Sequence, residues 1–253
     1  MINFEAFPIQ ADEKTEQIAK DIQAICLKVA EDNRGDVESA YVVQHSQSEL
    51  HALYEIAART HDRVHLDGYV LQCGLFCGGS ALMMAHAMRD DASNPHPLLA
   101  IDSYTKDYRP LRELFDDAYF EMRENLWEFR LQEHITPVLS DTVSYLQHFW
   151  RLPLRIAFVD SSHHYEPTLK ELNLILPHLV GGGWLILHDM FSEETPGVLR
   201  AVNEVFEPRD LSEFTFYRTD QLAIIRNCGV GTPVDTAADA AGDSDTPRWV
   251  PKK

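Results

Sequence analysis

The sequence has few cysteines, no leader-like start and no long apolar run. Its four cysteines, Cys26, Cys73, Cys77 and Cys228, are too scattered for a disulfide framework and form no C-x-x-C pair, which argues against structural zinc or a thioredoxin-type redox site. No stretch approaches the roughly 18 consecutive apolar residues of a membrane helix, and the first residues lack a basic region followed by an apolar one. We therefore expect a protein of a reducing compartment, the cytoplasm, with no membrane partner.

Basic residues are also scarce. Forty acidic residues against 22 basic ones give a formal charge of -18, which would repel a phosphate backbone. Nucleic acid is therefore not expected as a partner, and a small molecule becomes the default substrate. With 253 residues, 45% of them hydrophobic, the chain can bury one large α/β domain or two small ones.

Short apolar runs alternate with longer segments of helical periodicity. Near-continuous apolar strands joined by helices predict a Rossmann-like, mostly parallel sheet with helices on both faces. Runs at 214–218 and 222–226 are joined by three residues, a link that permits only an antiparallel hairpin.

We divide the chain into a helical lead-in (1–40), one domain (41–228) and a disordered tail (229–253). We expect strands at 69–75, 98–103, 135–139, 154–160 and 184–189, and helices at 12–31, from Ser46, at 79–89, 110–129 and 142–150, from Pro167 and at 197–206.

A glycine-containing loop follows the first of the parallel strands. It reads Gln72-Cys73-Gly74-Leu75-Phe76-Cys77-Gly78-Gly79-Ser80 and precedes a helix whose first N–H groups can hold polar ligand atoms. In open α/β sheets the ligand lies beyond the carboxyl ends of the strands, which makes this loop a candidate binding site. Phe76 stands where a dinucleotide fingerprint would have a second glycine, so the motif alone is weak.

Acidic and hydroxyl side chains follow the next two strands. Asp102 can accept hydrogen bonds from both hydroxyls of a ribose, or it can serve as a cap or turn residue. Ser140 and Asp141 can reach an adenine edge, while Asp141 can also cap the following helix. Tyr104 and Tyr108, just after Asp102, are candidates to flank the same ligand, with a turn-packing role equally open, and Ser103 is a further candidate contact.

Two further strands end in residues suited to metal binding and proton transfer. Asp160 and Asp189 end neighbouring strands, so their carboxylates can converge on a hard cation such as Mg²⁺, although Asp160 can also simply cap the next helix. His188 suits zinc, iron or manganese better than magnesium, or can be a satisfied core histidine. A histidine side chain ordinarily titrates near neutrality, which makes a general-base role chemically reasonable for His163, whereas we expect His164 on the surface or at a helix cap.

The order of these motifs along the chain resembles that of the class I S-adenosylmethionine-dependent methyltransferases. The motifs are the glycine loop, Asp102, Ser140-Asp141, VDSSHHYE and GGGWLILHD. The run from 159 to 202 is similar to the macrocin-type and mycinamicin-type sugar O-methyltransferases and to cephalosporin-hydroxylase-like proteins. The resemblance implies seven strands, the last antiparallel, and an O-methyltransferase of a small hydroxylated molecule such as a sugar or secondary metabolite. It also implies roles for single residues. The base would be His163, and a divalent metal, with Mg²⁺ preferred, would be bound by Asp160, His188 and Asp189. The cofactor would be contacted by Gln72, Gly74, Gly78, Gly79, Ser80, Asp102, Ser103, Tyr104, Ser140, Asp141 and Asp160.

Two alternatives stay open from the sequence alone. A non-catalytic binding module with the same fold would explain Gln72 in place of an acidic residue and Phe76 in place of glycine. A nicotinamide enzyme is disfavoured by the broken glycine fingerprint and the C-terminal hairpin.

The remaining histidines and aromatic residues give little sign of a site. We interpret four histidines as surface or lid residues: His45, His51, His61 and His65. We interpret one cluster as core or interface: Phe115, Tyr119, Phe120, Met122, Leu126 and Trp127. A homo-oligomer stays open.

Overall fold

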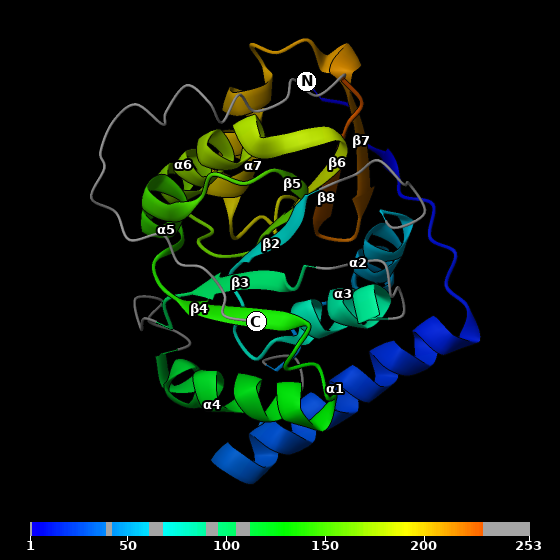
Figure 1. Ribbon diagram of the computed structural model, residues 1–253, viewed down its shortest axis with the longest axis vertical. Coiled ribbons are helices and arrows are strands. Elements are labelled where there is room, and N and C mark those ends of the chain that lie inside the picture. The colour runs from blue at the N-terminus through cyan, green and yellow to red at the C-terminus, as the bar shows by residue number, and fades with distance from the viewer. Residues whose placement is uncertain (1, 39–41, 61–67, 90–95, 105–111, 230–253) are drawn as a thin grey trace, which may run out of the picture.

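A single mixed sheet runs through the middle of the protein, with helices covering both of its faces (Figure 1). The structure is a computed structural model that describes residues 2–38, 42–60, 68–89, 96–104 and 112–229. The strands in chain order are β1 (Glu5–Ala6), β2 (Tyr69–Cys73), β3 (Leu98–Asp102), β4 (Ile135–Leu139), β5 (Leu154–Val159), β6 (Leu179–Leu187), β7 (Phe214–Thr219) and β8 (Leu222–Asn227).

The order of the strands across the sheet is β1-β7-β8-β6-β5-β2-β3-β4. β8 is antiparallel to both of its neighbours, and the other pairs are parallel. The predicted Rossmann-like class, with the last strand antiparallel, is confirmed. The eighth strand, β1, was not expected: it is two residues long and depends on pairing with β7, which lies far away in sequence, so no local pattern announces it.

The helices lie close to their predicted positions. One boundary differs: α6 begins at Tyr165, two residues before Pro167, and ends at Ile175, so that Leu176 starts a short 3₁₀ turn and Leu179 belongs to β6. The remaining helices are α1 (Glu13–Arg34), α2 (Gln47–Arg59), α3 (Gly79–Arg89), α4 (Arg112–Glu128), α5 (Thr142–Phe149) and α7 (Pro196–Phe206).

The central strands send alternate side chains into two hydrophobic cores. Val70 and Phe158 face the core under α1 to α4, while Leu71 and Val159 face the core under α5 to α7. Since successive side chains of a strand point to opposite faces, a strand buried on both sides must be apolar throughout. This burial explains why the predicted strands read as continuous apolar runs, and it leaves their carboxyl ends as the place where polar residues gather.

The N-terminal helices belong to the first of these cores. The predicted capping box of α2 is present: the Ser46 hydroxyl accepts the Glu49 N–H, and the Glu49 carboxylate accepts the Ser46 N–H. A buried ion pair between Arg34 Nε and Glu121 Oε1, 2.5 Å apart, joins α1 to α4. The N-terminal segment is therefore fixed against the sheet domain.

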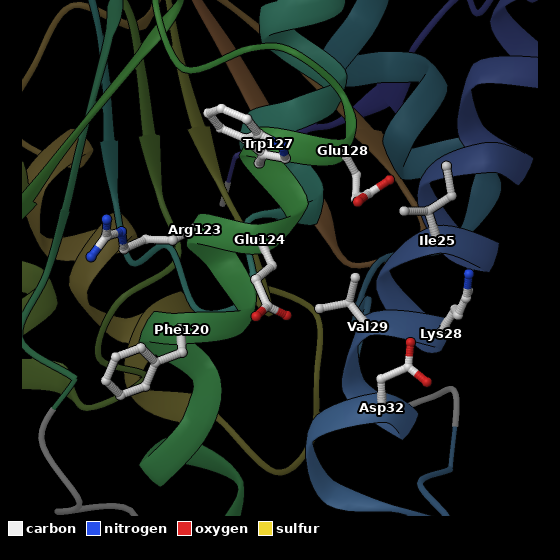
Figure 2. Close-up of a pocket in the computed structure, with 9 residues that line it drawn as sticks. All are labelled: Ile25, Lys28, Val29, Asp32, Phe120, Arg123, Glu124, Trp127 and Glu128. Carbon is white, nitrogen blue, oxygen red and sulfur yellow. The ribbon is translucent and has the colours of Figure 1, made fainter.

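Helices α1 and α4 also border a groove of about 570 Å³ on the outside of the molecule (Figure 2). Trp127 and Phe120 are 72% and 58% exposed on it, whereas Met122 and Leu126 are buried beneath. The predicted aromatic cluster on α4 thus divides between core and surface, and the structure does not describe the side chain of Phe115.

Some expectations fall on residues that the structure does not describe. These are the roles of His61, His65 and Tyr108 and the disorder of the tail beyond Gly229. Across the described part of the chain, none of the helices has the length and apolar character needed to span a membrane.

Candidate active site

A cavity of about 550 Å³ opens at the carboxyl ends of β2, β3, β5 and β6. Two loops complete its wall, residues 42–45 before α2 and residues 192–195 before α7. Four of the predicted site residues are not part of its lining: Gln72, Tyr104, Ser140 and His188. The others line the cavity: Gly74, Gly78, Gly79, Ser80, Asp102, Ser103, Asp141, Asp160, His163 and Asp189.

Gly74 lets the loop after β2 lie directly against the end of β5. Its φ of +87° is in the left-handed region, and a Cβ at this position would lie 1.9 Å from the backbone oxygen of Asp160. The Asp160 N–H donates to the Cys73 carbonyl at 2.8 Å, which joins the two strand ends. Only glycine fits here, so the loop and the Asp160 segment hold each other in place.

Asp102 holds the shape of the glycine loop. Its carboxylate accepts the N–H groups of Leu75, Phe76 and Tyr104 at 2.7 to 2.9 Å. Phe76 has a φ of +47°, a conformation that glycine adopts more easily, and the Asp102 bond stabilises it there. The Tyr104 hydroxyl donates to the Phe76 carbonyl at 3.0 Å, so Tyr104 has the turn-packing role that the sequence left open.

Gln72 lies inside the loop and does not reach the cavity. It is fully buried, and its Nε2 donates to the Gly74 carbonyl at 2.7 Å and to the Ser80 hydroxyl at 2.9 Å. An amide can make both bonds without the charge that a carboxylate would bury. Gln72 thus links the two ends of the loop, and a direct contact between Gln72 and the cofactor stays a prediction.

Asp141 has the predicted capping role and is also exposed to the cavity. Its carboxylate accepts the Ser144 N–H at 2.8 Å as the N-cap of α5, and the residue also lines the cavity. Ser140, by contrast, lies outside the wall, with its hydroxyl 3.1 Å from the Asp141 carbonyl.

Glu171 on α6 is a buried acid that sequence reasoning missed. It accepts hydrogen bonds from the hydroxyls of Thr142 and of Ser161, the latter at 2.6 Å, and both of these residues line the cavity. Burial raises the pKa of Glu171 from 4.5 to about 7, although the two hydroxyl bonds act in the opposite direction. No sequence motif marks this residue, because its helical position is typical of an ordinary polar face.

Four predicted residues after β5 and β6 converge in the structure, as the sequence predicts: Asp160, His163, His188 and Asp189. His163 Nε2 lies 3.4 Å from Asp160 Oδ1 and 3.4 Å from Asp189 Oδ2. His188 Nδ1 lies 3.3 Å from Asp160 Oδ1 and 3.6 Å from Asp189 Oδ1. Asp189 has a φ of +55°, and strained backbone of this kind is frequent at functional sites. His164 is exposed at the start of α6, as expected.

Two residues from before the glycine loop join this cluster, and sequence reasoning missed both. His45 was expected on the surface or in a lid; it is only 8% exposed, on the loop that lines the cavity, and its Nε2 lies 3.4 Å from Asp160 Oδ2. Glu49 extends from the α2 capping box to place Oε1 at 3.6 Å from His188 Nε2. The capping box was visible in the sequence, but nothing in it indicated which strand end the helix would meet. His51, expected on the surface, is also buried.

The charges in the cluster support one another. Burial alone would raise the pKa of Asp160, but His188 and hydrogen bonds from His163 and His188 hold it well below its usual range. Burial lowers the pKa of His188, and Asp160 and Glu49 more than compensate, raising it to about 11. The pKa of His163 is also raised: burial lowers it, while Asp160 and Asp189 raise it. The carboxylates thus form a strong cation-binding centre.

The donor atoms also fit a metal ion. His45, Asp160 and His188 offer ligand atoms within 4.8 Å of one another, and so do His163, His188 and Asp189. A set of imidazole nitrogens and carboxylate oxygens suits a divalent ion.

Comparison with known proteins agrees with this architecture. Residues 71–190 match the family model of a methyltransferase domain. This chain carries a methyltransferase domain. The match contains the glycine loop and both strand ends of the cluster, so the sequence prediction of a class I S-adenosylmethionine-dependent methyltransferase is confirmed. The N-terminal residues His45 and Glu49 lie before the matched region.

Solved structures of methyltransferases share the fold of this domain. The O-methyltransferase NovP aligns over 84% of this chain and 98% of its own, with a TM-score of 0.64 and 16% identity. TomG from Streptomyces achromogenes, involved in tomaymycin synthesis and solved with S-adenosylmethionine, aligns over 87% and 92%, with a TM-score of 0.58 and 14% identity. CalS11, a TDP-rhamnose 3'-O-methyltransferase, aligns over 86% and 96%, with a TM-score of 0.53 and 16% identity.

Proposed function

We propose that this methyltransferase transfers a methyl group to a hydroxyl of a small molecule, a sugar or a secondary metabolite, with the help of a divalent metal. The observation that carries the proposal is His163 between the carboxylates of Asp160 and Asp189, on the wall of a cavity that also contains the glycine loop. Structural neighbours that methylate oxygen in natural products, such as TomG and CalS11, support the same acceptor class.

The glycine-loop side of the cavity suits the cofactor. S-adenosylmethionine, when bound, supplies an electrophilic methyl group. We assign its contacts to the loop residues Gly74 and Gly78 to Ser80, to Asp102 and Ser103, and to Asp141. Asp102 Oδ1 accepts one backbone N–H, and a carboxylate oxygen can accept two, so capacity remains for a ribose hydroxyl.

The opposite side of the cavity suits the acceptor and a metal. We assign Asp160, His188 and Asp189 as ligands, since their donor atoms converge and one imidazole is already oriented between the two carboxylates. A bound divalent ion lowers the pKa of a coordinated hydroxyl and fixes its position. The two carboxylates by themselves favour Mg²⁺.

His163 is the proposed general base. Its Nε2 can receive the proton of the acceptor hydroxyl, and the resulting imidazolium then faces two carboxylates that stabilise it. Removal of this proton makes the acceptor oxygen a better nucleophile toward the sulfonium methyl. A cytoplasmic location and a homo-oligomer stay predictions.

Two measurements test the proposal. Calorimetry measures the binding of S-adenosylmethionine and S-adenosylhomocysteine. Methyl transfer is then measured on a panel of hydroxylated sugars and natural products, with and without a chelator. We expect both cofactor forms to bind, and transfer to an oxygen that the chelator suppresses. Absence of binding by either form would contradict the proposal and favour a non-catalytic module. Transfer that the chelator leaves unchanged would remove the metal from it.

A further inference from the structure

We propose that His45 is an additional ligand of the metal site and that Glu49 orients His188 within it, so that the site selects a borderline transition-metal ion of the zinc class over Mg²⁺. This inference rests on the proposed metal-assisted function and assigns roles to two residues outside the region that matches the methyltransferase model.

The His45 imidazole is buried next to the carboxylates and is only weakly held there. Its side chain is 6% exposed, and its Nε2 lies 3.4 Å from Asp160 Oδ2, an electrostatic contact that falls short of good hydrogen-bond geometry. A buried polar atom without a well-aligned partner is unfavourable. Coordination of a metal shared with Asp160 would satisfy this nitrogen.

His188 has the two-sided environment of a metal-bound histidine. Nδ1 faces Asp160 and Asp189, while Nε2 faces Glu49 Oε1 at 3.6 Å. A carboxylate behind the second ring nitrogen fixes the tautomer of a metal-binding histidine and raises its affinity for the ion.

Glu49 is itself held in place by backbone donors. Oε2 accepts the Ser46 N–H at 2.8 Å, and Oε1 accepts the Gln221 N–H at 2.9 Å. Glu49 is 3% exposed, and it connects the start of α2 with the hairpin between β7 and β8. A buried carboxylate fixed from two directions is well suited to orient the His188 ring.

The donor atoms lie close enough to share one ion. His45, Asp160 and His188 each offer a ligand atom within 4.8 Å of the others. His45 Nε2 lies 3.4 Å from Asp160 Oδ2, and His188 Nδ1 lies 3.3 Å from Asp160 Oδ1 and 3.6 Å from Asp189 Oδ1. Two imidazoles in the set favour zinc-class ions over Mg²⁺.

Metal titration of the full-length, metal-free protein tests the inference without any acceptor. Zn²⁺ and Mg²⁺ affinities would be compared by calorimetry, and Co²⁺ would report the ligand set through its visible absorption. We expect Zn²⁺ and Co²⁺ to bind at least about a hundredfold more tightly than Mg²⁺. His45→Ala should weaken Co²⁺ binding about ten- to a hundredfold and change its spectrum, and Glu49→Gln, which can keep the capping box, should weaken it about tenfold.

His164→Asn is the matched control, because this neighbouring histidine is exposed and has no place in the cluster. Tighter binding of Mg²⁺ than of Zn²⁺ by the wild-type protein would overturn the inference, and this measurement does not depend on the folding of a variant. A Co²⁺ spectrum unchanged in folded His45→Ala would also overturn it. Neither result would contradict the proposed O-methyltransferase function. That function is contradicted by a different result, the absence of S-adenosylmethionine binding.

Discussion

Asp102 and Asp160 end the two parallel strands that flank β2, at the same edge of the sheet, yet their surroundings are opposite. Asp102 accepts backbone N–H groups of the glycine loop and of Tyr104. Asp160 faces the imidazoles of His45, His163 and His188. One aspartate stabilises the backbone around the proposed cofactor site, and the other gathers the groups proposed to bind metal and transfer a proton.

The difference shows that equivalent positions at the edge of a parallel sheet gain different roles from the segments that reach them. The partners of Asp102 lie within 30 residues of it along the chain, in the loop after β2 and in its own turn. Asp160 depends in addition on His45, which is more than 100 residues away. The variants below separate these two kinds of strand end.

Asp160→Asn should have the largest effect. We expect kcat to fall about a thousandfold, because the proposed metal binding and the proposed stabilisation of a charged His163 would supply several kcal/mol to the reaction. Asp102→Asn should instead raise the KM for S-adenosylmethionine about tenfold with a smaller change in kcat. Initial rates of transfer from labelled S-adenosylmethionine measure both; a similar loss of kcat in the two variants would contradict the division of roles.

Gly74→Ala should disrupt both strand ends together. The added Cβ would lie 1.9 Å from the Asp160 backbone oxygen, so we expect the free energy of unfolding to drop by about 3 kcal/mol or more. Gly35→Ala is the matched control, because Gly35 has a similar φ of +84° with no atom near its Cβ position. It should lose only about 1 kcal/mol. Equal losses in urea unfolding would show that backbone strain, and not the close approach, makes Gly74 necessary.

Glu171→Gln should change how stability depends on pH. The folded protein holds the Glu171 proton up to about pH 7, whereas an unfolded glutamate releases it near 4.5, so this stabilisation is lost as the pH rises between these values. Because one pKa unit corresponds to about 1.4 kcal/mol, the variant should be more stable than the wild type by about 3 kcal/mol at pH 8 and similar to it at pH 4. Urea unfolding from pH 4 to pH 8 measures this difference in free energy of unfolding, with the exposed Glu166→Gln variant as control. If the stability of Glu171→Gln followed the same pH dependence as that of the wild type, the prediction would be wrong.

His188→Glu in a Glu49→Gln background should have the smallest effect. A third carboxylate oxygen suits Mg²⁺, and removal of the Glu49 charge prevents repulsion between adjacent acids. We expect the ratio of Zn²⁺ to Mg²⁺ affinity to fall about tenfold relative to Glu49→Gln alone, measured by calorimetry. An unchanged ratio would show that His45 and the carboxylates determine metal preference without His188.

The sequence predicts the sheet and its active edge well because both follow from local patterns. Continuous apolar runs identify the buried strands, and Asp102, Asp160 and Asp189 occur where those runs end. The two-residue β1 has no such pattern.

What the sequence does not reveal depends on contacts between distant segments. The capping box at Ser46 predicts the start of α2 but not that Glu49 would reach His188. Likewise, Gln72 has the position of a cofactor contact, and only the packing shows that its amide is used inside the loop.

The capping box of α2 has a consequence for anyone who prepares a shortened form of this protein. A fragment that begins at β2 would contain every motif of the methyltransferase domain, yet it would lack Ser46, Glu49 and His45. Such a fragment would keep the glycine loop while His188 lost its buried carboxylate neighbour. Boundaries for expression or domain exchange should therefore be set before α2.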